Sequence, residues 1–283
     1  NLDEFNVPNR PHQYEFSRLN LEFTTTSKRK LKLLVDNNHV SGWNDPRMPT
    51  ISGLRRRGYT PESIRDFSDR IGVSKVNSLT DVAILEASVR DNLNTIAPRS
   101  MAVINPVKLL IENYPNDKVE SLSAPLHPQN EGMGTREIFF SYELFIDKAD
   151  FIEVPPNNKY KRLAINKEVR LRNSYVIKAS HFDTDKDGNV KIIYCTYDPD
   201  TLGKNPSDGR KVKGVIHYVE CSTAIEAEFR IYDRLFLESN PENFEDLSSS
   251  LNPNSLQIKN GFVEFNLSNA KIEIAYQFER EGY

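Results

Sequence analysis

The stretch Trp43-Asn-Asp-Pro-Arg-Met-Pro-Thr-Ile-Ser-Gly-Leu-Arg-Arg-Arg-Gly-Tyr59 predicts a rigid turn that leads into a short helix. Pro46 and Pro49 fix their own φ angles and keep the residues before them out of the α region. Thr50 can cap a helix, and Gly58 can end it in the left-handed conformation that glycine tolerates. One short helix between two defined stops is therefore expected.

Three consecutive arginines, Arg55, Arg56 and Arg57, dominate that helix. Successive helical residues are about 100° apart, so the three side chains spread over roughly 200° and cannot share one solvent face. At least one should lie beside the apolar flank formed by Ile51 and Leu54. A guanidinium there needs an anion, and both an internal carboxylate and a phosphate satisfy that need.

Helical patterns lie on both sides of this short helix. Ser27 can cap a helix whose first turns carry cations, which oppose the helix dipole and require an anion nearby. Thr60-Pro61-Glu62 opens another helix, which Gly72 ends, and a further helix ends at Pro98. Residues 27–97 are thus predicted to form a small helical domain. The last helix is expected to bury Val82, Leu85, Val89, Leu93 and Ile96.

After Pro98 the hydrophobic period changes from that of a helix to that of a strand. Val107, Leu109 and Ile111 alternate with residues of the opposite face. Many short strands separated by Gly, Pro and Asp turns are typical of barrels or sandwiches. The fold class is therefore α+β and mainly β. Strands are expected near 136–146, 168–182, 190–197, 212–219, 225–232 and 256–279.

Composition restricts the class of protein. The 283 residues suffice for two or three domains, and no run of about 18 apolar residues predicts a membrane-spanning helix. Two cysteines are too few for a disulfide framework and suit a reducing compartment, so a cytoplasmic protein is expected. The net charge of −3 argues against an evenly basic nucleic-acid binder, but the cations are clustered while the acids are spread.

Two patterns resemble metal sites, and neither predicts one. Asp183-Thr-Asp-Lys-Asp-Gly188 matches the first half of an EF-hand loop, but Tyr194 stands where the loop's bidentate glutamate belongs. The flanking residues are strand-like, so a hairpin turn explains the segment without calcium. The five histidines show no metal-ligand spacing and no pairing with a nucleophile. No metal site is expected.

Two basic segments remain. Residues 204–213 lack the glycine spacing of a phosphate-binding P-loop and are interpreted as a basic hairpin loop. The sharper cluster contains Lys159, Lys161, Arg162, Lys167, Arg170 and Arg172. In a strand, the last two project from one face roughly 6.8 Å apart, which is near the spacing of successive nucleotides. Contacts with single-stranded RNA and pairing with acids on a neighbouring strand both remain open.

Trp43 to Tyr59 resembles the signature of the class I glutaminyl-tRNA synthetases. Further similar segments follow in that family's order: Ser-Lys-Arg-Lys-Leu at 27–31, Ala-Pro-Arg at 97–99, Tyr-Lys-Arg-Leu at 160–163, Lys-Glu-Val-Arg-Leu-Arg-Asn at 167–173, Asp-Gly-Arg-Lys-Val-Lys-Gly-Val-Ile-His at 208–217, Tyr-Asp-Arg-Leu-Phe at 232–236 and Gln-Phe-Glu-Arg-Glu-Gly-Tyr at 277–283. The resemblance covers most of the chain and implies its carboxy-terminal portion, without the nucleotide-binding catalytic domain.

The resemblance implies a helical connector followed by two anticodon-binding β-barrels, the first completed by the C-terminal strands. Residues 1–26 would end the catalytic domain, and residues 27–97 would form the connector with a K-M-S-K-S-like loop. The proximal barrel would contain 98–155 and 240–283, and the distal barrel 156–239.

The resemblance also implies roles for single residues. Ser27 and Lys28 fall on the ATP-binding loop, where the lysine would stabilise ATP phosphates, although Thr26 replaces the usual methionine. Lys159 stands where the family has glutamine, so its contact with tRNA would be electrostatic, and Lys161 belongs to the same tRNA-binding cluster. Arg99, Gln277 and Arg280 would bind the central anticodon base, Arg162 the third, and Arg170 with Arg172 the first. Arg55, Arg56 and Arg57 would contact tRNA backbone or pair internally.

The implied parent enzyme attaches glutamine to its tRNA through an aminoacyl-adenylate made from ATP with Mg²⁺. No H-I-G-H-like motif occurs in the sequence, so the chain alone is expected to bind tRNA, to hold no cofactor and not to aminoacylate. A monomer without membrane association is expected. Two alternatives remain open: the corresponding region of a barrel-type glutamyl-tRNA synthetase, and a non-catalytic RNA-binding barrel protein.

Overall fold

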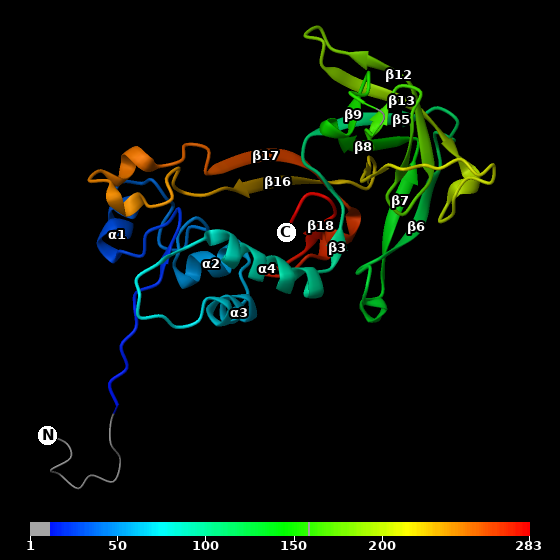
Figure 1. The fold of residues 1–283 in the computed structure, drawn as a ribbon. Helices are drawn as coiled ribbons and strands as arrows, with labels where there is room; N and C mark the ends of the chain where they lie inside the picture. Colours follow the sequence, from blue (N-terminus) through cyan, green and yellow to red (C-terminus); the bar gives the residue numbers. More distant parts are fainter. Residues whose placement is uncertain (1–11, 158) are drawn as a thin grey trace, which may run out of the picture. The chain divides into compact units, whose positions relative to one another are not determined.

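The structure is a computed structural model that describes residues 12–157 and 159–283 (Figure 1). The first eleven residues of the expected segment 1–26 lie outside the described residues. The chain divides into a helical unit, Asn1–Asn92 with Asp233–Ser255, and a β unit, Leu93–Tyr232 with Leu256–Tyr283. This division differs from the boundaries inferred from the sequence, because it groups 233–255 with the helices.

The helical unit is built from short helices with defined ends. They are α1 (Lys28–Asp36), α2 (Ile51–Arg57), α3 (Pro61–Ile71) and the start of α4 (Val82–Ile96), with a two-residue parallel pair between β1 (Asn20–Leu21) and β2 (Leu79–Thr80). The 3-10 helices η5 (Pro241–Asn243) and η6 (Leu247–Ser250) also belong to this unit. Its core consists of Leu31, Leu34, Val40, Met48, Leu235, Phe236 and Leu247.

The predicted helix stops are confirmed. The Thr50 side chain accepts a hydrogen bond from the Gly53 amide at 3.0 Å, and Gly58 is left-handed at φ 98°. Thr60 caps α3 in the same way. Gly53 is required by a close approach, because a Cβ there would lie 2.6 Å from the carbonyl oxygens of Asp45 and Met48. The helix therefore packs directly on the turn that precedes it.

Asp45 organises that turn. Its buried carboxylate accepts hydrogen bonds from the amide and hydroxyl of Ser41 and from the amide, Nε and Nη2 of Arg47. Burial alone would raise the pKa of Asp45, but the hydrogen bonds from Arg47 and Ser41 hold that pKa well below its ordinary value. The turn is thus fixed by an ionised carboxylate as well as by its prolines.

One expectation about a buried residue is wrong. Ile96 is 49% exposed and Val82 is only partly buried, whereas Leu85, Val89 and Leu93 are buried as expected. Ile96 is the last residue of its helix. A periodicity identifies the covered face of a helix, but it does not show how far the covering elements extend along that face.

The β unit contains a seven-stranded sheet in the order β14-β11-β12-β13-β5-β8-β15. Its strands β5 and β8 come from the predicted proximal region, and β11 to β14 come from the distal one, so the parallel pairing of β13 with β5 joins both regions in one sheet. The strands are β5 (Pro106–Ile111), β8 (Glu143–Asp147), β11 (Glu168–Leu171), β12 (Val176–Thr184), β13 (Val190–Asp198), β14 (Val215–Ile216) and β15 (Val219–Glu220).

Smaller sheets complete the unit. β6 (Val119–Pro125) pairs with β7 (Thr135–Ser141), and β16 (Ile225–Tyr232) forms a long ribbon with β17 (Leu256–Val263), which also pairs with β4 (Ala102–Val103). β18 (Gln277–Phe278) runs parallel to β3 (Arg99–Ser100), and β10 (Leu163–Ala164) runs parallel to β9 (Phe151–Ile152). These pairings bring the last residues of the chain beside residues 99 and 100 (Figure 1).

The strand pattern is confirmed in outline and corrected in detail. Val107, Leu109 and Ile111 are buried, and the EF-hand-like segment is the turn of the β12–β13 hairpin. β6 was not expected, most of 212–219 is irregular, and Phe265–Asn269 forms a 3-10 helix, η7. In the part of the chain that the structure describes, no helix is long and apolar enough to cross a membrane.

Candidate nucleic-acid interface

Strand β11 places the basic cluster of the β unit. Val169 and Leu171 are fully buried, so the alternation expected for this strand holds, and Arg170 with Arg172 lie on its other face. β11 contributes Glu168 to one cleft, and Arg170 with Arg172 line a second. The strand therefore presents charged groups to two separate concave surfaces.

The first cleft, here called the lysine cleft, has a volume of about 600 Å³. Its lining includes Lys159, Lys161, Lys167, Lys178, Lys211 and Lys213. Among their ammonium groups, only that of Lys167 has a hydrogen bond or a ring contact within 12–157 and 159–283: it donates to the Tyr160 carbonyl and lies 5.5 Å from the centre of the Tyr160 ring. The other five are exposed, and their charge attracts anions.

The lysine cleft depends on a close approach of two backbones. A Cβ on Gly214 would lie 2.1 Å from the Lys161 carbonyl oxygen, so only glycine fits there. The Gly214 carbonyl in turn accepts a hydrogen bond from the Arg170 amide at 2.8 Å. Residues 204–213 were expected to form a hairpin loop, but they connect η4 (Pro199–Thr201) to β14, which pairs with β11 and not with β13.

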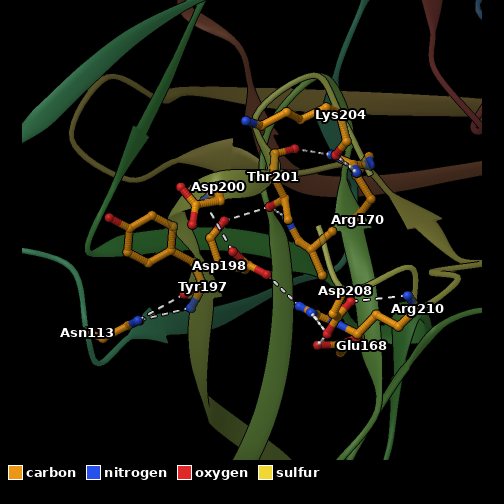
Figure 2. Close-up of polar contacts among 11 residues, drawn as sticks. Asn113, Glu168, Arg170, Tyr197, Asp198, Asp200, Thr201, Lys204, Asp208 and Arg210 are labelled. Atoms are coloured by element: carbon orange, nitrogen blue, oxygen red, sulfur yellow. Dashed lines mark hydrogen bonds and ion pairs between the residues drawn. The ribbon is translucent and has the colours of Figure 1, made fainter. Parts of the chain in front are cut away.

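The second cleft, here called the arginine cleft, has a volume of about 650 Å³ and includes Arg170, Arg172 and Lys204. Arg170 Nη1 donates to the Ser174 carbonyl at 3.0 Å. It also donates to the Thr201 carbonyl at 2.6 Å, and Nη2 donates to the Lys204 carbonyl at 2.6 Å (Figure 2). Burial lowers the pKa of Arg170. Three of its five N–H donors are thus used, two for the segment that carries Thr201 and Lys204 and one for the turn between β11 and β12.

Arg210 fastens the same segment from the lysine cleft. Its guanidinium contacts the carboxylates of Glu168, Asp198 and Asp208 (Figure 2). Hydrogen bonds to these carboxylates, first of all the one to Asp208, raise the pKa of Arg210 above its ordinary value. Arg170 and Arg210 therefore serve as structural ties for the segment between β13 and β14, which carries Lys204, Lys211 and Lys213.

A buried carboxylate, Asp150, binds two of the expected anticodon-reading arginines. Arg280 donates from Nη1 and Nη2 to the two Asp150 oxygens at 2.5 and 2.6 Å. Arg162 Nε lies 3.5 Å from Asp150 Oδ1, and its Nη1 donates to the Ala149 carbonyl at 2.8 Å. The hydrogen bond to Asp150 raises the pKa of Arg280. The structure thus brings these two arginines together.

A second acidic residue, Glu279, ties Arg172 to a buried ionic network. Glu279 contacts Arg172 through Oε2 and accepts from Arg136 Nη2 through Oε1 at 2.9 Å. Arg136 also binds both oxygens of Glu264, and these three residues are nearly inaccessible to solvent. Arg172, directly after β11, therefore pairs with an acid, but Glu279 follows β18 and does not lie on β12 or β14, the strands that neighbour β11.

Arg99 and Gln277 are register partners in the β3–β18 pair. The buried Arg99 donates to the Ala97 carbonyl at 2.7 Å and to the carbonyl and side chain of Asn94 at 3.0 and 2.9 Å. Two of the three residues expected at the central base are therefore neighbours in a strand pair, and Phe278 leads from Gln277 into the turn that carries Arg280.

The remaining expected site residues belong to the helical unit. Ser27 is the N-cap residue of α1 but its side chain forms no cap hydrogen bond, and Lys28 is exposed. Glu242 lies beside this cationic helix start: its carboxylate accepts from Thr25 and Arg18, its main-chain carbonyl accepts from Lys30 Nζ, and its pKa is lowered, chiefly through Thr25. Arg55, Arg56 and Arg57 form the last turn of α2.

Sequence reasoning missed the acids that hold these arginines. Asp150, Glu264 and Glu279 were not singled out, nor was His217, which is fully buried beside Arg280. The run Glu279-Arg280-Glu281 is a local sign of such pairing, since it places an arginine between two acids. Across 12–157 and 159–283, no group of three or more His, Cys, Asp or Glu residues could hold a metal ion.

Three family models match consecutive parts of the chain. Residues 97–198 and 215–283 each match a model described as tRNA synthetases class I (E and Q), anti-codon binding domain. Residues 2–95 match the catalytic-domain model of the same class, which therefore includes the segment interpreted as a connector. The chain belongs to the class I tRNA synthetases of the E and Q type.

Among curated relatives, the chain is similar to proteins named glutamine–tRNA ligase. It is 61% identical over 282 residues to the one from Proteus mirabilis, covering 100% of this chain and 50% of the relative. It is 60% identical over 273 residues to that from Haemophilus influenzae, covering 96% and 48%, and 57% identical over 283 residues to that from Alteromonas mediterranea, covering 100% and 51%. The chain spans about half the length of these relatives.

Proposed function

We propose that this chain is the anticodon-binding and connector region of a glutamine–tRNA ligase, an enzyme that attaches glutamine to its tRNA through an ATP-derived aminoacyl-adenylate. The observation that carries the proposal is the pair of clefts beside β11. One supplies exposed lysines without ion pairs among the described residues, and the other supplies guanidinium groups fixed by the fold. The anticodon-binding family models on both parts of the β unit support it.

The two clefts supply different kinds of contact. Lysines are flexible point charges, so Lys159, Lys161, Lys211 and Lys213 would attract and neutralise phosphates without reading sequence. Arginines present a planar fork that matches paired acceptors on a base edge. In this proposal Arg170 and Arg172 contact the first anticodon base, Arg162 the third, and Arg99, Gln277 and Arg280 the central one.

The finer architecture is part of the proposal. Residues 98–155 with 240–283 would form a proximal barrel and residues 156–239 a distal one, in a monomer that acts in the cytoplasm. The pairing of β18 with β3, and of β17 with β4, supports completion of the first barrel by the C-terminal strands.

A catalytic role is proposed for one residue of the chain. Lys28, at the start of α1 and preceded by Ser27, would contact ATP phosphates, with Mg²⁺, when the nucleotide-binding part and glutamine are present. The chain alone should bind tRNA without charging it. The measurement is incubation of the chain with ATP, glutamine and tRNA, and the appearance of glutaminyl-tRNA would contradict this part of the proposal.

The binding test compares variants of the lysine cleft with a matched surface lysine. Replacing both Lys211 and Lys213 with alanine should weaken tRNA binding equally for cognate and altered anticodons. It should also flatten the plot of log K against log salt concentration by roughly 0.7 for each lost phosphate contact. Lys186, exposed in the β12–β13 turn, supplies the control as Lys186→Ala. Fluorescence anisotropy with labelled tRNA measures both quantities.

An unchanged salt dependence in the double variant would remove the lysine cleft from the RNA-binding surface. Binding of unrelated RNA as tightly as tRNA by the unaltered chain would count against the anticodon-binding role itself, because electrostatic attraction alone does not select a partner.

A further inference from the structure

Asp150 is placed to control how Arg280 meets an RNA base. It ends the 3-10 helix η3 (Lys148–Asp150), and its side chain is 3% exposed. Both of its oxygens bind one arginine that comes from 130 residues further along the chain. A two-point contact fixes the plane of a guanidinium, whereas a single contact leaves it free to rotate.

His217 accepts a further hydrogen bond from the Arg280 guanidinium. Its Nδ1 lies 3.0 Å from Arg280 Nη1, and because a guanidinium has only donors, Nδ1 must be the accepting nitrogen. Burial lowers the pKa of His217 and favours this neutral form. The ring is fully buried, and its Nε2 forms no hydrogen bond with any described residue; the carboxylate of Glu281 lies 3.7 Å from it.

These contacts account for three of the five N–H donors of Arg280. Asp150 takes one hydrogen of Nη1 and one of Nη2, and His217 takes the second hydrogen of Nη1. The donors left over are Nε–H and the outer Nη2–H, which point in parallel from one edge of the guanidinium. Such an edge matches two neighbouring acceptors on a base or a phosphate.

The backbone of Arg280 is also fixed, by a tight turn. Arg280 is left-handed at φ 72°, in a turn where the Phe278 amide donates to the Gly282 carbonyl at 2.7 Å and the Gly282 amide donates to the Phe278 carbonyl at 3.0 Å. Arg162 approaches the same carboxylate from the other end of the β9–β10 connection, with Nε 3.5 Å from Asp150 Oδ1. One acid thus orients two arginines that come from separate segments.

We propose that Asp150, assisted by His217, is a positioning residue for RNA recognition, which presents a single two-donor edge of Arg280 and couples Arg280 to Arg162. This inference rests on the proposed function. It implies that recognition of the central and third anticodon bases is interdependent. Arg280 and Arg162 share the Asp150 carboxylate, so when one guanidinium moves toward its base, the attraction between Asp150 and the other guanidinium changes.

The test uses the 283-residue chain and four tRNAs: the cognate, one changed at the central base, one changed at the third, and one changed at both. Asp150→Asn keeps the size of the side chain but offers one acceptor and turns an amide donor toward Arg280. It should reduce discrimination at the central base by about tenfold, which corresponds to about 1.4 kcal/mol, and at the third base by a smaller factor. Asp187→Asn removes an exposed acid from the β12–β13 turn and should change neither ratio.

Interdependence of the two bases gives a second measurement, which would not change if Asp150 had only a structural role. For the unaltered chain, the penalty for changing both bases should differ from the product of the single penalties, and in Asp150→Asn the penalties should multiply. If circular dichroism shows that Asp150→Asn does not fold, Asp150→Glu is used instead. It keeps the charge but shifts the carboxylate that binds Arg280, so it should reduce discrimination at the central base and not at the third.

The outcomes separate the two proposals. Discrimination by the unaltered chain that persists within twofold in the Asp150 variants would overturn the positioning role and leave the proposed function intact. Equal weakening of all four tRNAs would reduce Asp150 to a structural residue. Absence of any discrimination by the unaltered chain would refute the anticodon-binding function, and the positioning role with it.

Discussion

Replacing Arg136 with methionine should destabilise the β unit far more than the loss of an exposed arginine does. Arg136 is 2% exposed in its side chain and donates five hydrogen bonds. Three go to Glu264, one goes to Glu279 and one goes to the Pro125 carbonyl at 2.5 Å. Methionine fills most of the volume but supplies no donor, so the buried Glu264 loses its ion-pair partner and Glu279 keeps only Arg172.

The expected cost follows from that geometry. Removing one partner of a buried ion pair costs about 3–5 kcal/mol, because the remaining charge stays desolvated and unpaired. With a urea dependence of about 2–3 kcal/mol per molar, the unfolding midpoint should fall by about 1–2 M. The control is Arg230→Met, which breaks an ion pair with Glu228 whose side chains are 51% and 47% exposed. It should cost less than about 1 kcal/mol.

The same variant should depend on pH in a defined direction. Burial raises the pKa of Glu264 in spite of Arg136, and removal of Arg136 should raise it further. A carboxyl with a raised folded-state pKa contributes stability that is fully present below its unfolded pKa and is lost as pH rises through the folded value. The deficit of Arg136→Met relative to the unaltered chain should therefore shrink between pH 7 and pH 5.

Urea unfolding followed by near-ultraviolet circular dichroism of the tyrosines is the assay, since Tyr114, Tyr175 and Tyr218 are buried in the same core of the β unit. A midpoint change no larger than that of Arg230→Met would refute the reasoning. So would a deficit that grows on acidification, because it would mean that Glu264 is not the group left unpaired.

Three further predictions concern single positions. Gly214→Ala should cost about 1–3 kcal/mol in urea unfolding and weaken tRNA binding, because its Cβ would overlap the Lys161 carbonyl; Gly132→Ala, where a Cβ meets only a side-chain oxygen at 3.2 Å, should cost less. Asp45→Asn should lower the free energy of unfolding by about 3 kcal/mol at pH 7 and at pH 5. The difference from the unaltered chain should disappear only as the pH falls through the lowered pKa of Asp45, which acid unfolding of the two proteins would measure. Arg57→Ala should lower affinity for cognate and altered tRNAs alike and flatten the salt dependence, whereas loss of helical circular dichroism would identify it as a structural pairing residue.

The sequence predicted those parts of the fold that depend on neighbouring residues. Thr50, Gly58 and Thr60 act where the local pattern placed them, because caps and left-handed stops are determined within a few residues. The burial of Val169 and Leu171 follows from the two-residue period in the same way. The family resemblance supplied the order of the segments, and the family models on 97–198 and 215–283 confirm it.

What the sequence could not predict was pairing between distant segments. The union of β13 with β5 in one sheet, and the approach of Arg280 to Asp150, join residues that no period relates. The burial of Ile96, at the end of its helix, was predicted wrongly for a related reason, since its exposure depends on where the elements that cover the helix stop. Burial of acids was equally hidden, because Glu264 in a local sequence context resembles any surface glutamate.

The buried pairs explain how a chain with a net charge of −3 can present an RNA-binding surface. Arg162, Arg172 and Arg280 each have an acidic partner, so they add little to the long-range field and instead hold fixed orientations. The exposed lysines of the lysine cleft have no acidic partner among the described residues, so they are the groups that attract phosphate. Affinity and base selection should therefore respond to different variants: removal of cleft lysines should change the salt dependence, and removal of the acids behind the arginines should change discrimination at nearly constant salt dependence.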